Sequence, residues 1–166
     1  MIVVADTSPV LHLARIGRLE LIRAVLGEVI VPRTVWSELI QPGTRLEVVA
    51  MVRTAAWIAV VEDPELRDLG LDPGETAAIL LASSLRADAI LIDERRGRGV
   101  ATGMGLAVIG TLGVLAGAKR AGVIALARPV IAELRTDGFW LADALAEEFL
   151  RNLGEARRQD EQDESR

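Results

Sequence analysis

Four acidic side chains stand at points of the sequence where a parallel β-sheet would gather them. Asp6 directly follows the apolar run IVVA and Asp93 directly follows AILI, while Glu38 and Glu75 lie on helical segments that leave the same edge. Carboxylate oxygens are hard ligands that suit hard cations. Without a cation, four neighbouring carboxylates would repel one another, and some of their pKa values would rise. The pattern therefore predicts a site for Mg or Mn.

Each of these carboxylates also has an ordinary structural explanation. Asp6 and Asp93 can each cap a helix, although Ser8 before Pro9 is the better N-cap for the first helix. Glu38, taken alone, could simply be a helix residue exposed to solvent. These alternatives stay open on the sequence alone.

A capping role is also available to Glu75. Asp72 and Glu75 stand three residues apart at a helix start, which is the spacing of a capping box. Asp88 precedes the fourth apolar run, so we expect it at the opposite edge of the sheet and exclude it from the site.

Other catalytic chemistry has little support. The chain has no cysteine and a single histidine, His12, which excludes a thiol nucleophile, a thiolate zinc site and a two-histidine acid–base pair. A phosphatase or phosphotransferase that uses Asp6 as its nucleophile is an alternative. Such an enzyme would require a second Asp two residues after Asp6, where the chain has Ser8. A non-catalytic binding module is the other alternative.

Strand-like and helix-like segments alternate along the chain. Apolar, β-branched runs predict strands at residues 2–5, 29–31, 57–61, 89–92 and 106–109. Helical periodicity and capping signals predict helices at residues 10–26 (interrupted near Gly17), 32–40, 45–55, 73–86, 111–120, 129–134 and 143–153. This alternation indicates an α/β domain with a mainly parallel five-stranded sheet between two helical layers, whose functional site lies at the carboxyl ends of the strands.

The length of 166 residues suits one domain. We expect it to span residues 1–154, followed by a disordered charged tail at 155–166, where apolar residues are almost absent. The absence of cysteine, of a signal peptide and of a membrane-length apolar stretch leads us to expect a cytoplasmic protein that does not enter a membrane.

The net charge of −5 at first argues against a nucleic-acid partner. Leaving the four carboxylates out as metal ligands changes −5 to −1, which weakens the objection. Arg95, Arg96 and Arg98 closely follow Asp93. They are equally consistent with a solvated turn and with capture of a phosphate beside the metal.

Five segments together resemble a known family. VVADTSPVLHLARIG, VIVPRTVWSEL, LDPGETAAILLA, AILIDERRGRGVA and GLAVIGTLGVLAGAKRAGVI resemble, in order, the successive motifs of PIN-domain proteins, and most closely the subgroup of VapC-type toxin ribonucleases. The likeness covers roughly residues 2–154. It implies a sheet of order 3-2-1-4-5 and a Mg- or Mn-dependent endoribonuclease, with a bound ion that activates water for attack on the phosphodiester.

The resemblance also assigns roles to individual residues. Asp6, Glu38, Glu75 and Asp93 match the acidic quartet that is both catalytic and metal-binding. The third acid, Glu75, is an Asp in many of these toxins. Ser8 matches a small hydroxyl residue beside the first acid, and Arg98 a basic residue that contacts the substrate phosphate.

Toxins of this kind act on RNA, usually form homodimers and are silenced by a small antitoxin protein. We therefore expect RNA as substrate, a homodimer, and an antitoxin as possible partner. Phe139 and Trp140 are a plausible contact patch, with burial in the core as the alternative.

Overall fold

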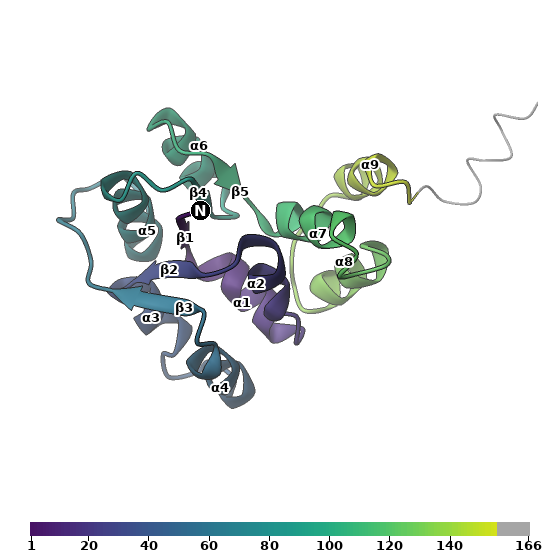
Figure 1. Cartoon of the computed structure of the whole chain (residues 1–166), viewed down its shortest axis with the longest axis horizontal. Helices are drawn as coiled ribbons and strands as arrows, with labels where there is room; N and C mark the ends of the chain where they lie inside the picture. The colour runs from purple at the N-terminus through teal and green to yellow at the C-terminus, as the bar shows by residue number, and fades with distance from the viewer. Residues whose placement is uncertain (156–166) are drawn as a thin grey trace, which may run out of the picture.

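Five short strands form an all-parallel sheet in the order β3-β2-β1-β4-β5 (Figure 1). The structure, a computed structural model, describes residues 1–155. The strands are β1 (Val3–Ala5), β2 (Val29–Pro32), β3 (Ile58–Val61), β4 (Ala89–Leu91) and β5 (Val108–Ile109). Val4 in the central strand pairs with Ile30 on one side and with Ile90 on the other. The predicted strand order and the parallel sheet are confirmed.

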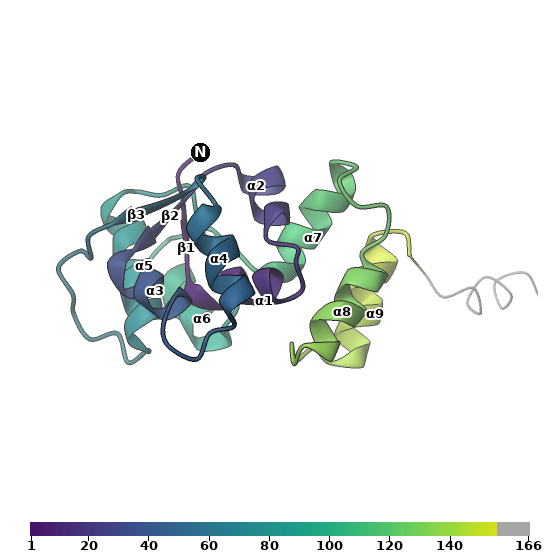
Figure 2. The same ribbon diagram turned by 90° about the horizontal axis from the view of Figure 1, so that it is seen from below.

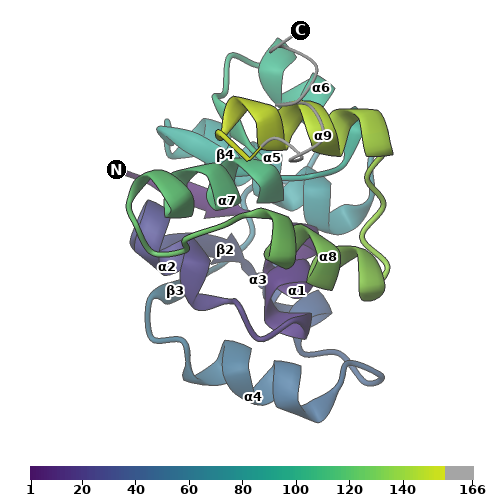
Figure 3. The same cartoon turned by 90° about the vertical axis from the view of Figure 1, so that its right-hand side faces the viewer.

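Helices cover both faces of the sheet. They are α1 (Thr7–Arg15), α2 (Glu20–Leu26), α3 (Arg33–Leu39), α4 (Leu46–Thr54), α5 (Pro73–Ser84), α6 (Arg95–Gly103), α7 (Thr111–Arg120), α8 (Arg128–Thr136) and α9 (Asp143–Asn152). Because the chain reverses its direction across the sheet after β3, right-handed connections put α1 and α2 on the face opposite α5. Helix α3 packs against both α1 and α5. Figure 2 shows α8 and α9 beyond α7, away from the sheet, and Figure 3 shows these three helices facing the viewer.

The sheet is buried on both faces, as its sequence implies. Residues of β1 and β4 are fully or almost fully inaccessible, and α5 is buried from Gly74 to Ala82. Strands covered on both faces need continuous apolar runs rather than alternation. This central packing fixes the ends of β1 and β4, and with them the residues that follow those strands.

Two helix boundaries differ from the prediction. The long helix predicted at residues 10–26 is two helices, because Gly17 adopts a left-handed backbone (φ 70°) that ends the first. The first helix also begins earlier than Ser8 suggested. Its N-cap is Asp6, whose side chain makes no capping hydrogen bond, so the prediction of Ser8 as the cap is wrong.

Helix α6 was not predicted. Its sequence, RRGRGVATG, contains three glycines, which lower helix propensity by about 1 kcal/mol each relative to alanine. The helix buries Gly97 and Ala101, four residues apart on one face. Close packing of these two small residues against the domain outweighs the poor local propensity.

The folded part of the chain extends through Glu155, one residue into the segment predicted to be a tail. Glu155 is buried, and its carboxylate accepts hydrogen bonds from Lys119 Nζ (2.7 Å) and from the backbone N–H groups of Ala127 (2.7 Å) and Arg128 (2.9 Å). The rest of the predicted tail lies outside the described residues. No helix among residues 1–155 is both long and apolar enough to cross a membrane.

Candidate active site

The carboxyl edge of the sheet carries Asp6 after β1 and Asp93 after β4. The Asp6 backbone N–H donates to the Leu91 carbonyl at 2.9 Å, which continues the pairing of the two strands up to the acids. Asp88 lies at the opposite edge, where its carboxylate accepts a hydrogen bond from the Ile2 backbone N–H at 2.6 Å. The exclusion of Asp88 is therefore correct.

Asp6 is the most deeply buried of the four acids, with 2% of its surface exposed. Burial, opposed by the Thr7 backbone N–H and reinforced by the negative charges of Glu75, Asp72 and Glu38, raises the pKa of Asp6 to about 7. At neutral pH the site therefore holds a proton, or a cation, more readily than an isolated aspartate would.

Glu38 reaches the site from α3. It accepts a hydrogen bond from the Thr7 hydroxyl, and its carboxylate lies so close to α5 that a Cβ built on Gly74 would collide with both of its oxygens. Burial and the charge of Asp72 raise the pKa of Glu38, although the Thr7 hydroxyl and the Gly74 N–H oppose the shift. Glycine at position 74 therefore leaves room for the Glu38 carboxylate where it now lies.

Glu75 stands in the first turn of α5, where a capping contact and a buried carboxylate are found together. The Asp72 carboxylate caps the helix by accepting the Glu75 backbone N–H at 2.8 Å. The Glu75 side chain is buried, and its Oε1 has no hydrogen-bond partner among residues 1–155. Burial and the charges of Asp72 and Glu94 raise its pKa. Helix α6 also crosses it closely, since a Cβ on Gly97 would stand 2.5 Å from that oxygen.

Asp93 has a different environment. Its Oδ1 accepts the Thr111 backbone N–H at 2.7 Å, and its Oδ2 accepts the Thr111 hydroxyl at 2.7 Å. The same Oδ2 lies 3.1 Å from Nδ1 of His12. Burial acts to raise the pKa of Asp93, but the hydrogen bonds from His12 and Thr111 outweigh it and hold the pKa below its usual value. The Asp93 carboxylate thus accepts hydrogen bonds from the first turn of α7, and it lies at the carboxyl edge of the sheet.

The acidic cluster consists of Asp6, Glu38, Glu75 and Asp72, with Asp93 beside it. The charges of Glu75, Asp72 and Glu38 help to raise the pKa of Asp6, and the charge of Asp72 helps to raise the pKa values of Glu38 and Glu75. As the side chains stand, no three acidic or histidine groups in the described part of the chain converge enough to hold one ion. The chemistry of the donors nevertheless fits a divalent cation, because the set is all oxygen and includes the unpartnered, buried Oε1 of Glu75.

Ser8 and Arg98, the two predicted phosphate contacts, have different surroundings in the structure. The Ser8 hydroxyl makes no hydrogen bond to any residue the structure describes, and its neighbour Thr7 is the residue that bonds Glu38. Arg98 lies near Asp93, and its Nη1 donates to the Ile92 carbonyl at 3.1 Å. Both Arg98 and Asp93 crowd Gly110, where a Cβ would stand 2.6 Å from the Arg98 Nη1. Arg98 is therefore at the site, held by backbone rather than by a carboxylate.

A family model for the PIN domain matches residues 2–155. This chain belongs to the PIN-domain family. PIN domains are typically nucleases and generally use divalent metal ions. The match spans the whole acidic cluster and the helices that carry it.

A solved structure agrees on the fold. A PilT N-terminus domain protein from the hyperthermophilic archaeon Sulfolobus solfataricus P2 is similar to this chain with a TM-score of 0.51 and 16% sequence identity. The match covers 70% of this chain and 92% of that one. At this identity the likeness concerns the fold alone. No match was found among curated proteins.

Sequence reasoning missed four participants, the first of which is Thr7, the neighbour of Ser8 whose hydroxyl bonds Glu38. Thr111 directly follows Gly110 after β5, so the rule that strand ends gather at one edge would have found it. Asp72 was interpreted only as a cap, but its charge acts on the whole cluster. His12 had no such signal, because its contact with Asp93 depends on how α1 packs near the end of β4.

Proposed function

We propose that this PIN-domain protein is a Mg- or Mn-dependent endoribonuclease whose ion is held by Asp6, Glu38 and Glu75, with Asp93 as the fourth acid. The observation that supports it best is a set of buried and half-buried carboxylates that no lysine or arginine neutralises, with His12 beside Asp93 as the single basic contact in the described chain. Among residues 1–155, no lysine or arginine forms a salt bridge with any of these four acids, and Glu75 keeps a buried oxygen unpartnered. Uncompensated buried charge is costly unless a cation joins it.

The chain's own groups would prepare the site for this ion. Glu38 and Asp93 accept hydrogen bonds from the hydroxyls of Thr7 and Thr111, and together with Asp6 and Glu75 they would supply the oxygens that hold the ion. When bound, Mg or Mn lowers the pKa of a coordinated water and stabilises charge on the phosphodiester. Arg98, which has no carboxylate partner in the described chain, would contact a phosphate oxygen. The expected products carry a 5′-phosphate and a 3′-hydroxyl.

The test is cleavage of a mixed RNA pool in Mg, in Mn and in EDTA. We expect the wild type to cleave only with metal, and Asp6→Asn to lose about 10²-fold or more in rate. Asp88→Asn is the matched control, since Asp88 lies at the opposite edge of the sheet, and we expect it to cleave like the wild type. Equal cleavage by Asp6→Asn and wild type would overturn the proposal.

As part of the same proposal, the chain acts as the toxin of a toxin–antitoxin pair and forms a homodimer. The support in this chain is two exposed apolar side chains near the C-terminal helix, Trp140 with 84% of its surface exposed and Leu145 with 50%. Phe139 is not such a side chain, because its ring packs edge-on against His12 at 4.9 Å between centroids. Light scattering that shows a strict monomer at high concentration would contradict the homodimer, and failure of a co-expressed antitoxin to suppress cleavage would contradict the toxin role.

A further inference from the structure

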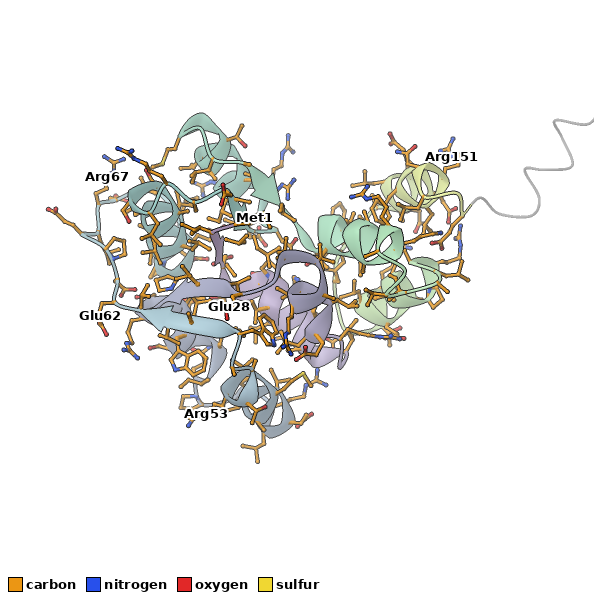
Figure 4. All side chains as sticks on the ribbon, viewed as in Figure 1. Met1, Glu28, Arg53, Glu62, Arg67 and Arg151 are labelled. Carbon is orange, nitrogen blue, oxygen red and sulfur yellow. The ribbon has the colours of Figure 1, made fainter. Side chains whose placement is uncertain are left out.

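A groove runs between α6 and the segment that joins β3 to α5. It is open to solvent, has a volume of about 590 Å³ and is lined by Leu69, Leu71, Arg95, Arg96, Gly99 and Val100. Figure 1 shows this segment running outside α5 toward α6, and Figure 4 labels Glu62 and Arg67 along it. A volume of this size lies within the range of pockets that take a small organic ligand.

The two arginines of the groove are not neutralised by the protein. Arg95 forms no hydrogen bond or ion pair within residues 1–155. Arg96 donates one hydrogen bond from Nη2 to the Gly70 carbonyl at 2.9 Å and has no carboxylate partner there. By contrast, many arginines elsewhere in this acidic chain are paired with acids, such as Arg18 with Glu133.

Most acids of the neighbouring segment are held by other groups. Glu62 pairs with Arg33 at 2.7 Å, and the Asp63 carboxylate accepts hydrogen bonds from Thr34. Asp68 accepts the Gly70 backbone N–H within its own turn at 2.7 Å. These acids therefore do not bond to the groove arginines, and the guanidinium groups remain available to an anionic ligand.

The apolar wall of the groove is fixed rather than loose. Leu69, Leu71 and Val100 are half-buried and pack against the hydrophobic core. A wall of this kind offers apolar surface to a flat, weakly polar group. Together with two uncompensated guanidinium groups, it matches a nucleotide, which combines a base with a phosphate.

Helix α6 links the groove to the acidic cluster. Gly97 faces the Glu75 carboxylate, whereas Arg96 and Val100 project from the adjacent face toward the groove. Arg98 projects on the other side, near Asp93 and Gly110. The groove and the acidic cluster are therefore joined by the first turns of α6, and Leu71 of the groove directly precedes Asp72 of the cluster.

We propose that this groove binds the nucleotide next to the scissile phosphate of a single-stranded nucleic acid, with Arg95 and Arg96 on its phosphate and Leu69, Leu71 and Val100 against its base. This inference rests on the proposed nuclease function. Arg95 and Arg96 act as binding residues for the substrate strand, whereas Asp6, Glu38 and Glu75 are reserved for the chemistry.

The test measures binding apart from cleavage. A labelled single-stranded oligoribonucleotide of eight nucleotides is titrated with the full chain in EDTA, and fluorescence anisotropy gives the Kd at several salt concentrations. The double variant Arg95→Gln/Arg96→Gln is compared with Arg53→Gln/Arg151→Gln, which removes two exposed arginines that form no ion pair in the described chain. Figure 4 shows Arg53 and Arg151 on α4 and α9, away from the groove.

We expect the groove variant to bind at least about 10-fold more weakly, and the salt slope to fall by about 0.7 for each phosphate that the variant no longer neutralises. The control pair should bind like the wild type. Equal losses of affinity in both double variants would overturn the groove as a specific site, and so would an unchanged groove variant or a wild type that does not bind.

The nuclease proposal fails separately. If Asp6→Asn cleaves normally while the groove variant loses affinity, the groove stands and the assignment of the acids falls. If the groove variant cleaves the oligonucleotide with wild-type KM while Asp6→Asn is inactive, the nuclease stands and the groove falls.

Discussion

His12 and Asp93 contact each other at the carboxyl edge of the sheet, with Nδ1 of the histidine 3.1 Å from Oδ2 of the aspartate. The histidine ring also packs edge-on against Phe139, with 4.9 Å between the ring centroids. Thr111 supplies two further hydrogen bonds to the same carboxylate. Asp93 is therefore oriented by α1 and by the first turn of α7, elements far from it in sequence.

His12→Ala should destabilise the fold. The substitution removes a hydrogen bond to a half-buried carboxylate, which typically contributes about 1–3 kcal/mol. Urea unfolding at neutral pH measures the loss. Arg15→Ala, an exposed substitution on the same helix, is the control and should change the free energy of unfolding little. If the two variants are equally stable, the interaction with His12 does not hold Asp93.

Asp6→Asn should stabilise the metal-free protein at high pH. The pKa of Asp6 is raised to about 7 from 3.8, so the folded state keeps a proton that the unfolded state releases. In EDTA, stability should therefore fall as pH rises from about 4 to 7. The full shift corresponds to a penalty on the order of 4 kcal/mol at most, part of which the neutral amide avoids. Thermal melts at pH 5 and pH 8 measure it.

The advantage of Asp6→Asn over wild type should be larger at pH 8 than at pH 5. Asp93→Asn provides the contrast, because the lowered pKa of Asp93 means that its carboxylate contributes stability above its unfolded pKa. That variant should be less stable than wild type at both pH values. An Asp6→Asn variant that becomes less stable relative to wild type as pH rises would refute the assignment.

Gly97→Ala and Gly99→Ala should have opposite effects although they lie on one helix. A Cβ at Gly97 would stand 2.5 Å from Glu75 Oε1 and 2.6 Å from Ile92 Cδ1, both buried, whereas nothing lies within 4 Å of a Cβ at Gly99. Gly99→Ala should gain about 0.5–1 kcal/mol from helix propensity. Gly97→Ala should lower the melting temperature. A higher melting temperature of Gly97→Ala would show that α6 does not pack closely against Glu75.

Glu155→Ala should destabilise the chain by about 3 kcal/mol, because it leaves Lys119 and two backbone N–H groups at the start of α8 without their partner. Glu148→Ala is the control, since Glu148 is exposed and makes no hydrogen bond or ion pair in the described chain. Urea unfolding compares the two. Equal stability of both variants would mean that Glu155 does not anchor the C-terminal helices.

The sheet could be predicted because its strands are continuous apolar runs, and the residues that follow β1 and β4 are placed by that sheet. The same rule located Asp6 and Asp93 at one edge and Asp88 at the other. It did not reveal that Asp93 bonds to Thr111 and His12, because that depends on tertiary packing of α1 and α7. Helix α6 could not be predicted for a similar reason, because its glycines locally disfavour a helix. The need for a glycine becomes apparent only in the tertiary structure, where Gly97 contacts Glu75.

The most direct test of the acidic cluster as a metal site is calorimetric titration with Mn²⁺ at neutral pH. The wild type should bind the ion, and Asp6→Asn should lose most of that affinity. Asp88→Asn, with its substitution at the opposite edge of the sheet, should bind like the wild type. A wild type that takes up no Mn²⁺, or an Asp6→Asn variant that binds it as tightly as the wild type, would contradict a metal site at this cluster.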